Sequence, residues 1–200
     1  MIKTVLEMFS KRFCFFMPNL PKITTSLVLK DELSLQQIES VVELINKVYL
    51  ITESDFWPHN GSYERTNASE ITRFIKNKEL IIAQIAEEIV GAVHVYPVKE
   101  DICGFGMLVA APKKRGCGIG VTLMESIEDW AINNEYKIMQ LELLKPINYK
   151  HPDKEFLKRW YTKMGYKLTS KSSYGKLYPK QASLLKIPCN FEIYQKNLPI

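Results

Sequence analysis

The sequence predicts a single α/β domain in which helices flank a mixed, mostly antiparallel central sheet. Apolar residues recur at strand and helix spacing in alternation along the chain. Two apolar runs flank Glu87-Glu88 as a hairpin, which makes an antiparallel pair. A helix after residue 120 returns the chain to a parallel neighbour. The 200 residues, 46% of them hydrophobic, suffice for one core.

The first elements follow from helix-start signals. Residues 25–30 predict a strand. Ser34 and Gln37 form a capping box before a helix that carries apolar residues at helical spacing, namely Leu35, Ile38, Val41, Val42, Ile45 and Val48. Residues 52–66 contain Pro58 and Gly61 and predict a loop, after which Asn67 caps a short second helix.

The remaining elements alternate again. Strands are predicted over residues 80–86, 90–98, 103–109, 137–144, 166–170 and 190–194. Helices are predicted over residues 120–134 and from Pro152 to Gly165, because proline opens helices and glycine ends them. A short helical turn precedes the last strand.

Residues 1–24 differ from the rest of the chain, so we expect a poorly ordered extension before a domain over residues 25–200. Met17 is an alternative start. The apolar core at residues 13–17 is too short for a secretory signal, and no apolar stretch reaches the 18 to 20 residues that span a bilayer. We therefore expect no membrane partner.

The charged and metal-binding residue types exclude several classes of function. The cysteines and histidines lack paired or metal-ligand spacing, which predicts a reducing, cytoplasmic location and no metal. The four cysteines are Cys14, Cys103, Cys117 and Cys189, and the three histidines are His59, His94 and His151. The net charge of +5 is spread out, so no nucleic-acid partner is expected.

A glycine-rich run joins the strand before residue 110 to the following helix. Gly116, Gly118 and Gly120 let backbone N–H groups approach a ligand, and the helix start adds partial positive charge, so a pyrophosphate is the natural guest. The even spacing differs from the Gly-x-Gly-x-x-Gly of dinucleotide sites, and no Gly-Lys-Ser/Thr is present for a nucleoside triphosphate.

Arg115-x-x-Gly118-x-Gly120 resembles the acetyl-coenzyme A loop of the GCN5-related N-acetyltransferase (GNAT) family. Trp160-Tyr161, with Gly165 after it, resembles a second family motif. The resemblance implies the GNAT fold over about residues 25–200 and acetyl-CoA as co-substrate. It implies cofactor contacts from Leu108, Val109, Ala110, Lys114, Arg115, Gly116, Cys117, Gly118, Ile119, Gly120 and Val121.

The same resemblance implies catalytic roles. The Leu108 N–H would stabilise the oxyanion of the tetrahedral intermediate, and Tyr161 would donate a proton to the leaving thiolate. The alternative for Tyr161 is a core tyrosine on an apolar stripe. One departure stands out: relatives commonly carry asparagine seven residues before this tyrosine, and this chain has Lys154.

The base and the acceptor site are less specific. Glu142 is the candidate general base, with a solvated or structural role as the alternative, and His94 is either a core histidine or a base. The loop residues Glu53, Asp55 and Trp57 are expected to hold the acceptor ammonium, unless the loop is plain surface. Arg65 in the same loop equally suits an acceptor that bears a carboxylate.

Together these features predict direct acetyl transfer from acetyl-CoA to a primary amine of a small molecule in a ternary complex. Cys117 belongs to the phosphate loop and is not expected to act as a nucleophile. A protein amine as acceptor and a non-catalytic acyl-CoA sensor are the alternatives. A closed pocket lined by residues 52–66 would favour a small amine, and an open groove would favour protein. The oligomeric expectation is a monomer or homodimer.

Overall fold

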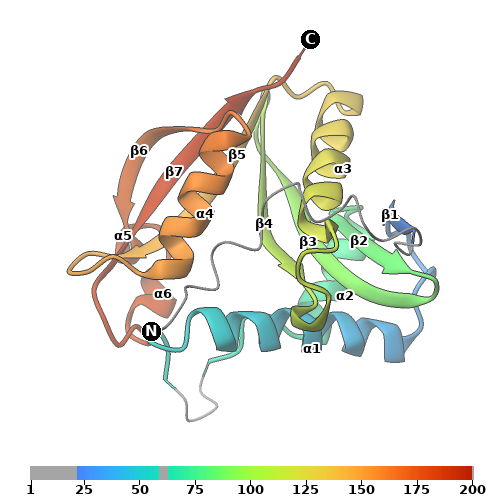
Figure 1. Cartoon of the computed structure of the whole chain (residues 1–200), viewed down its shortest axis with the longest axis horizontal. Helices are drawn as coiled ribbons and strands as arrows, with labels where there is room; N and C mark the ends of the chain where they lie inside the picture. The colour runs from blue at the N-terminus through green and yellow to red at the C-terminus, as the bar shows by residue number, and fades with distance from the viewer. Residues whose placement is uncertain (1–21, 59–62, 200) are drawn as a thin grey trace.

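The computed structural model of the protein describes residues 22–58 and 63–199 (Figure 1). Seven strands form one sheet in the order β1-β2-β3-β4-β5-β7-β6. Only β4 and β5 run parallel, so the prediction of a mixed, mostly antiparallel sheet is confirmed. The extension predicted over residues 1–24 lies almost entirely outside the described residues. In the described part of the chain, no helix has the length and apolar character needed to cross a membrane.

The elements appear in the predicted order, with two short helices before the last strand where one helical turn was predicted. The strands are β1 (Ile23–Leu27), β2 (Leu80–Ile85), β3 (Glu88–Lys99), β4 (Ile102–Ala110), β5 (Ile138–Pro146), β6 (Lys167–Ser173) and β7 (Cys189–Asn197). The helices are α1 (Leu35–Thr52), α2 (Ala68–Lys76), the 3-10 turn η3 (Pro112–Lys114), α3 (Ile119–Asn133), α4 (Pro152–Lys163), α5 (Tyr174–Leu177) and α6 (Pro179–Ala182).

The start signals of the first two helices are confirmed. The Ser34 hydroxyl accepts a hydrogen bond from the Gln37 N–H, and the Gln37 side chain accepts one from the Ser34 N–H. Asn67 caps α2 by accepting from the Glu70 N–H at 3.0 Å. The first strand, in contrast, both starts and ends earlier than predicted, because it pairs with β2, which begins at Leu80. Just beyond it, the Glu32 carboxylate accepts the Leu29 N–H at 2.8 Å in a turn.

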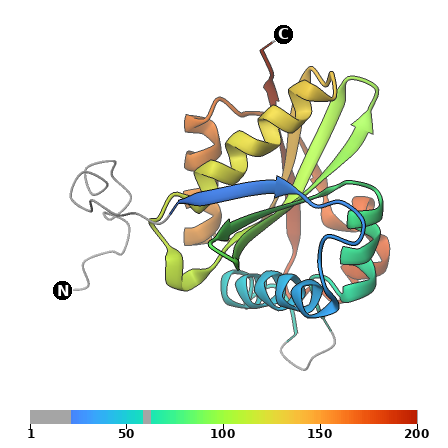
Figure 2. The same cartoon turned by 90° about the vertical axis from the view of Figure 1, so that its right-hand side faces the viewer.

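The helices cover both faces of the sheet. Figure 2 shows α3 and α4 on one side and α1 and α2 on the other. Alternate strand residues feed two cores, the first packed against α3 and the second against α1 and α2. Gly91 on β3 lets α3 come close to the sheet, since a Cβ there would lie 2.7 Å from Ile119 Cγ2. This packing places the N-terminus of α3 next to the end of β4.

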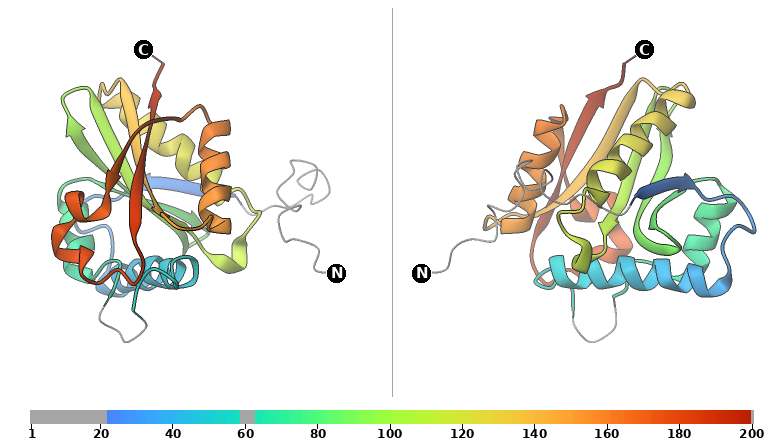
Figure 3. Two further views of the ribbon diagram at one scale, coloured as in Figure 1. Left: turned by 90° about the vertical axis from the view of Figure 1, so that its left-hand side faces the viewer. Right: turned by 45° about the vertical axis from the view of Figure 1, so that its right-hand side comes forward.

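A third apolar cluster lies beneath the two short helices before β7. Phe56 and Trp57, which follow α1, pack with Tyr174 of α5 and Phe191 of β7. Figure 3 shows α5 and α6 at the end of the sheet along which α1 runs. The chain after β6 therefore returns to the segment that follows α1, although more than 100 residues separate them.

Candidate active site

The sheet opens between its two central strands. The parallel pairing of β4 with β5 covers only Ile102–Phe105 against Ile138–Leu141. Beyond it, β4 bulges: Met107 has φ 51°, and the register with β3 shifts next to it. A Cβ on Gly106 would meet no atom within 4 Å, so space lies directly beside the strand. The result is a wedge between β4 and β5, with unpaired backbone groups at its edge.

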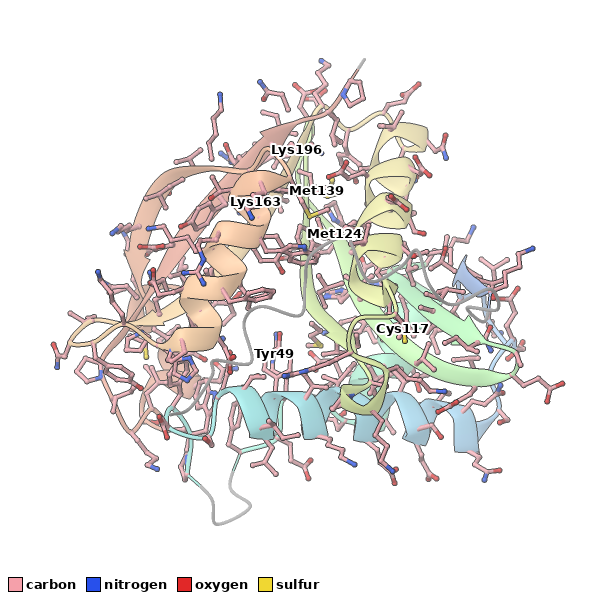
Figure 4. All side chains as sticks on the ribbon, in the orientation of Figure 1. Tyr49, Cys117, Met124, Met139, Lys163 and Lys196 are labelled. Atoms are coloured by element: carbon pink, nitrogen blue, oxygen red, sulfur yellow. The ribbon has the colours of Figure 1, made fainter. Side chains whose placement is uncertain are left out.

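A cavity of about 740 Å³ adjoins this wedge. Its walls come from β4, β5, the end of α1, residues 63–67, α4 and α5. Figure 4 shows Tyr49 on the side of α1 that faces the space between β4 and α4. Aromatic side chains dominate the lining, namely Tyr49, Trp57, Tyr63, Phe74, Tyr96, Phe105, Tyr161, Tyr174, Tyr178 and Phe191. Such a volume suits a small organic ligand.

The glycine loop forms an anion cradle beside the wedge. Gly116 and Gly118 adopt φ values of 83° and 89°, where a side chain would be strained, and a Cβ on either would point into open space. Gly118 is the N-cap of α3 and gives it no side-chain cap. The first amides of α3 are therefore open to an anion. Cys117 lies in this loop, just before the helix (Figure 4).

Of the two basic residues next to these glycines, one is exposed and the other forms an ion pair. Arg115 is exposed, and Lys114 lies 3.3 Å from the Glu88 carboxylate in a partly exposed pair. Both belong to the glycine loop, and their cationic groups are of a kind that forms charge-assisted bonds to phosphate. The cradle, with its two left-handed glycines and uncapped helix start, thus has the features of an anion-binding site.

Tyr161 lines the cavity from α4. Its ring is 6% exposed and packs edge-on against Phe105 and Tyr166, each with ring centroids 5.9 Å away. Burial, with a smaller effect of Tyr49, raises the pKa of this phenol, so the hydroxyl stays protonated at neutral pH. Leu108, one residue past the bulge, lines the same cavity from β4. Two of the three residues predicted to be catalytic therefore line one cavity.

Glu142 reaches the cavity from β5, across the wedge from β4. The Tyr178 hydroxyl donates a hydrogen bond to its carboxylate at 3.0 Å. Burial and then Glu142 raise the pKa of Tyr178 to about 12, so the phenol remains a donor. Tyr96 lies over Gly104, where any Cβ would come within 2.8 Å of its ring. Sequence reasoning missed Tyr178, because nothing near it in sequence marks it as a cavity residue.

Of the three residues expected to hold the acceptor ammonium, two are engaged in contacts within the protein and the third is exposed. Glu53 is 4% exposed and is already engaged: Lys154 pairs with one carboxylate oxygen, and the Trp57 indole N–H donates to the other at 2.8 Å. Trp57 stacks on Tyr63 with ring centroids 3.8 Å apart. Asp55 is exposed and lies outside the cavity lining. Lys154, the departure from the family pattern, thus fixes α4 to the end of α1.

Two further residues of the cavity carry charge or can acquire it. His94 stacks on Phe74 with ring centroids 3.6 Å apart. Burial, followed by Arg65 and Arg73, lowers the pKa of His94 to about 4, so at pH 7 a neutral imidazole makes the 3.3 Å hydrogen bond with Glu79. Arg65 also lines the cavity. Among the residues described, no group of three acidic, histidine or cysteine side chains is arranged to hold a metal ion.

Comparisons with known proteins agree with this geometry. The family model described as "Acetyltransferase (GNAT) domain" matches residues 76–168. Mosquito arylalkylamine N-acetyltransferase like 5b aligns with a TM-score of 0.64 at 14% identity, over 88% of this chain and 100% of its own. The yncA protein of Salmonella typhimurium, solved with its cofactor acetyl-CoA, aligns at 0.63 and 11% identity, over 90% and 95%.

A protein-modifying enzyme is similar as well. Ribosomal-protein-alanine N-acetyltransferase from Brucella melitensis aligns with a TM-score of 0.60 at 13% identity, over 88% of this chain and 99% of its own. No curated protein sequence matched the chain. At these identities the structural likeness establishes the fold.

Proposed function

Because this chain belongs to the GNAT family and is an acetyl-CoA-dependent acetyltransferase, we propose that it acetylates the primary amine of a small molecule by direct attack in a ternary complex. One observation carries the proposal: the wedge between β4 and β5 opens into an aromatic cavity of about 740 Å³ that Tyr161, Leu108 and Glu142 all line. Residues 63–67 and α5 wall the cavity, which favours a small acceptor over a protein segment.

The donor lies along residues 108–121. The amides at the start of α3 bind the pyrophosphate, with Lys114 and Arg115 at its edge, and the bulged part of β4 offers backbone groups to the pantetheine arm. Cys117 stays in the phosphate loop and takes no part in bond making. Acetyl-CoA supplies the activated acyl group.

The chemistry needs one base, one oxyanion donor and one acid. Glu142 takes a proton from the ammonium, and the neutral nitrogen attacks the thioester carbonyl carbon. The Leu108 N–H donates to the oxyanion that forms. The C–S bond then breaks, and the Tyr161 phenol protonates the thiolate. The nitrogen loses its second proton to solvent as the amide forms, and solvent returns a proton to the Tyr161 phenolate. The raised pKa of Tyr161 keeps that proton in place until a strongly basic thiolate appears.

The free thiols Cys103, Cys117 and Cys189 support a reducing, cytoplasmic location, which we also propose.

The test combines cofactor binding with turnover. We expect acetyl-CoA to raise the melting temperature of the protein, and amines from a panel to release free coenzyme A thiol with formation of an N-acetyl product. Peptides and lysine-containing proteins serve as competing acceptors. Faster turnover of peptides than of any small amine would refute the acceptor class, and binding without turnover of any amine would favour an acyl-CoA sensor.

A further inference from the structure

Several of the charges that line the cavity are already paired within the protein. Glu53 is matched by Lys154, and Glu70 by Arg73 at 3.1 Å. Among the described residues, no carboxylate lies within 4.0 Å of the Arg65 guanidinium, and no cation lies that close to Glu142. Among the described lining residues, Arg65 is therefore a cation without a carboxylate partner, and Glu142 and the exposed Glu64 are carboxylates without an ion pair. Desolvated charges in proteins are normally paired, so the half-buried Arg65 and Glu142 suit a ligand of complementary charge.

Arg65 is held in place by the protein itself. The side-chain amide of Asn46 on α1 forms two hydrogen bonds with the backbone of the next residue: it accepts the Thr66 N–H at 3.0 Å and donates to the Thr66 carbonyl at 2.9 Å. The guanidinium lies over the ring of Tyr49, 5.0 Å from its centroid. Tyr49 also forms a side-chain hydrogen bond with Arg65. A guanidinium carries five N–H donors, so donors beyond this bond suit a carboxylate.

Arg65 and Glu142 line the same cavity, and Tyr96 and Tyr178 line it with them. Burial is the main cause of the raised pKa values of Tyr96 and Tyr178, and in both phenols Glu142 raises the pKa further whereas Arg65 lowers it. Both charges thus act on the same two rings. The ligand that would satisfy them carries an anion at one end and an ammonium at the other.

We propose that the acceptor is a free amino acid or a similar small amine with a carboxylate, and that Arg65 binds this carboxylate while Glu142 faces the reacting amine. The inference rests on the proposed acetyl transfer and names its substrate class. The aromatic lining offers apolar and cation–π contacts to the rest of the molecule, which favours an amino acid with an apolar or aromatic side chain.

The experiment compares matched amines on the full chain. Phenylalanine, its amide and phenethylamine share the apolar body and differ in the carboxylate. We expect kcat/KM for thiol release to be highest for phenylalanine, and Arg65→Gln to lower it by about 10- to 100-fold for the acid, with little effect on the two amines that lack a carboxylate. Arg65→Lys should recover part of the loss, because it restores charge but not the bidentate geometry.

The matched control removes a paired charge from the same cavity rim. Arg73→Gln loses a guanidinium that is already bound to Glu70, so the preference for the acid should stay within about twofold of wild type. Melting temperatures of all variants show whether each folds. Equal turnover of acid and amide by the wild type would overturn the proposal. An equal loss on all three amines in a folded Arg65→Gln variant would overturn it as well.

A second readout separates this inference from the proposed transfer. Binding of phenylalanine to the complex with coenzyme A, measured by calorimetry, requires no chemistry. If no amine is acetylated but phenylalanine binds the wild type and not Arg65→Gln, the transfer proposal fails and the carboxylate site stands. If acetylation proceeds and neither binding nor rate distinguishes the acid from its amide, the carboxylate site fails and the transfer stands.

Discussion

The ion pair between Glu53 and Lys154 joins elements 101 residues apart, and breaking it should destabilise the fold strongly. Their side chains are 5% and 6% exposed, and Glu53 also accepts the Trp57 indole N–H. Lys154 lies 5.4 Å from the centroid of the Phe56 ring, among apolar neighbours. A charge left alone here has little water to solvate it.

The expected magnitudes follow from that burial. Lys154→Met leaves the Glu53 carboxylate uncompensated, which costs about 3–5 kcal/mol of the free energy of unfolding. For a chain of this size, that corresponds to a fall in melting temperature of roughly 6–20 °C. The double variant Glu53→Gln with Lys154→Met removes both charges and keeps an acceptor for the Trp57 N–H. It should therefore lie within about 2 kcal/mol of the wild type or exceed it.

Urea unfolding followed by circular dichroism measures all four corners of this cycle. The control is Arg73→Met, which breaks the Glu70 pair, whose side chains are 63% and 31% exposed; it should cost at most about 0.5 kcal/mol. The reasoning is refuted if Lys154→Met costs no more than this control. It is also refuted if the double variant is as unstable as the sum of the two single ones, because the residues would then act independently.

Three further outcomes are expected. Tyr161→Phe keeps the ring packing and should lower kcat by about 10²- to 10⁴-fold while the Kd for acetyl-CoA stays unchanged; a parallel loss of binding would contradict the acid role. Gly118→Ala forces a side chain into φ 89°, so it should lower the free energy of unfolding by about 1–2 kcal/mol and weaken acetyl-CoA binding in calorimetry. In the control Gly175→Ala the new Cβ would lie 3.6 Å from Ala182, so neither stability nor binding should change. The pKa of His94 is near 6.5 in the unfolded chain and about 4 in the folded protein, so His94 does not lower the free energy of unfolding above pH 6.5 and lowers it by up to about 3 kcal/mol as the pH falls toward 4. Urea denaturation at several pH values measures this, and the same pH dependence in His94→Phe as in the wild type would contradict it.

Local signals accounted for most of the fold. Capping at Ser34 and Asn67 and the glycine loop before α3 depend on residues a few positions apart, and sequence reasoning found them. The first strand differs from its predicted bounds because its extent follows its partner: β2 begins at Leu80, whose carbonyl accepts the Val28 N–H. The bounds of a partner strand about 50 residues away are not visible in a pattern of apolar residues.

The acceptor side was harder to predict for a physical reason. Its walls meet only in three dimensions: Tyr178 reaches Glu142 over 36 residues, and Lys154 reaches Glu53 over 101. Glu53 has the chemistry to hold an ammonium, as predicted, but a lysine of the chain itself already occupies that carboxylate. Residue type alone cannot tell a charge that awaits a ligand from one that the protein has neutralised.

The short pairing between β4 and β5 also leaves the sheet as two halves that are joined by few hydrogen bonds. Four register pairs hold β1–β4 to β5–β7, and each half has its own extensive antiparallel pairing. The seam is thus the weakest line of the sheet, and amide hydrogens next to it should exchange with solvent faster than those within either half. A donor molecule lying in the wedge would add contacts to both sides. While it is bound, the donor would therefore hold the two halves of the sheet together, and its release would remove that link.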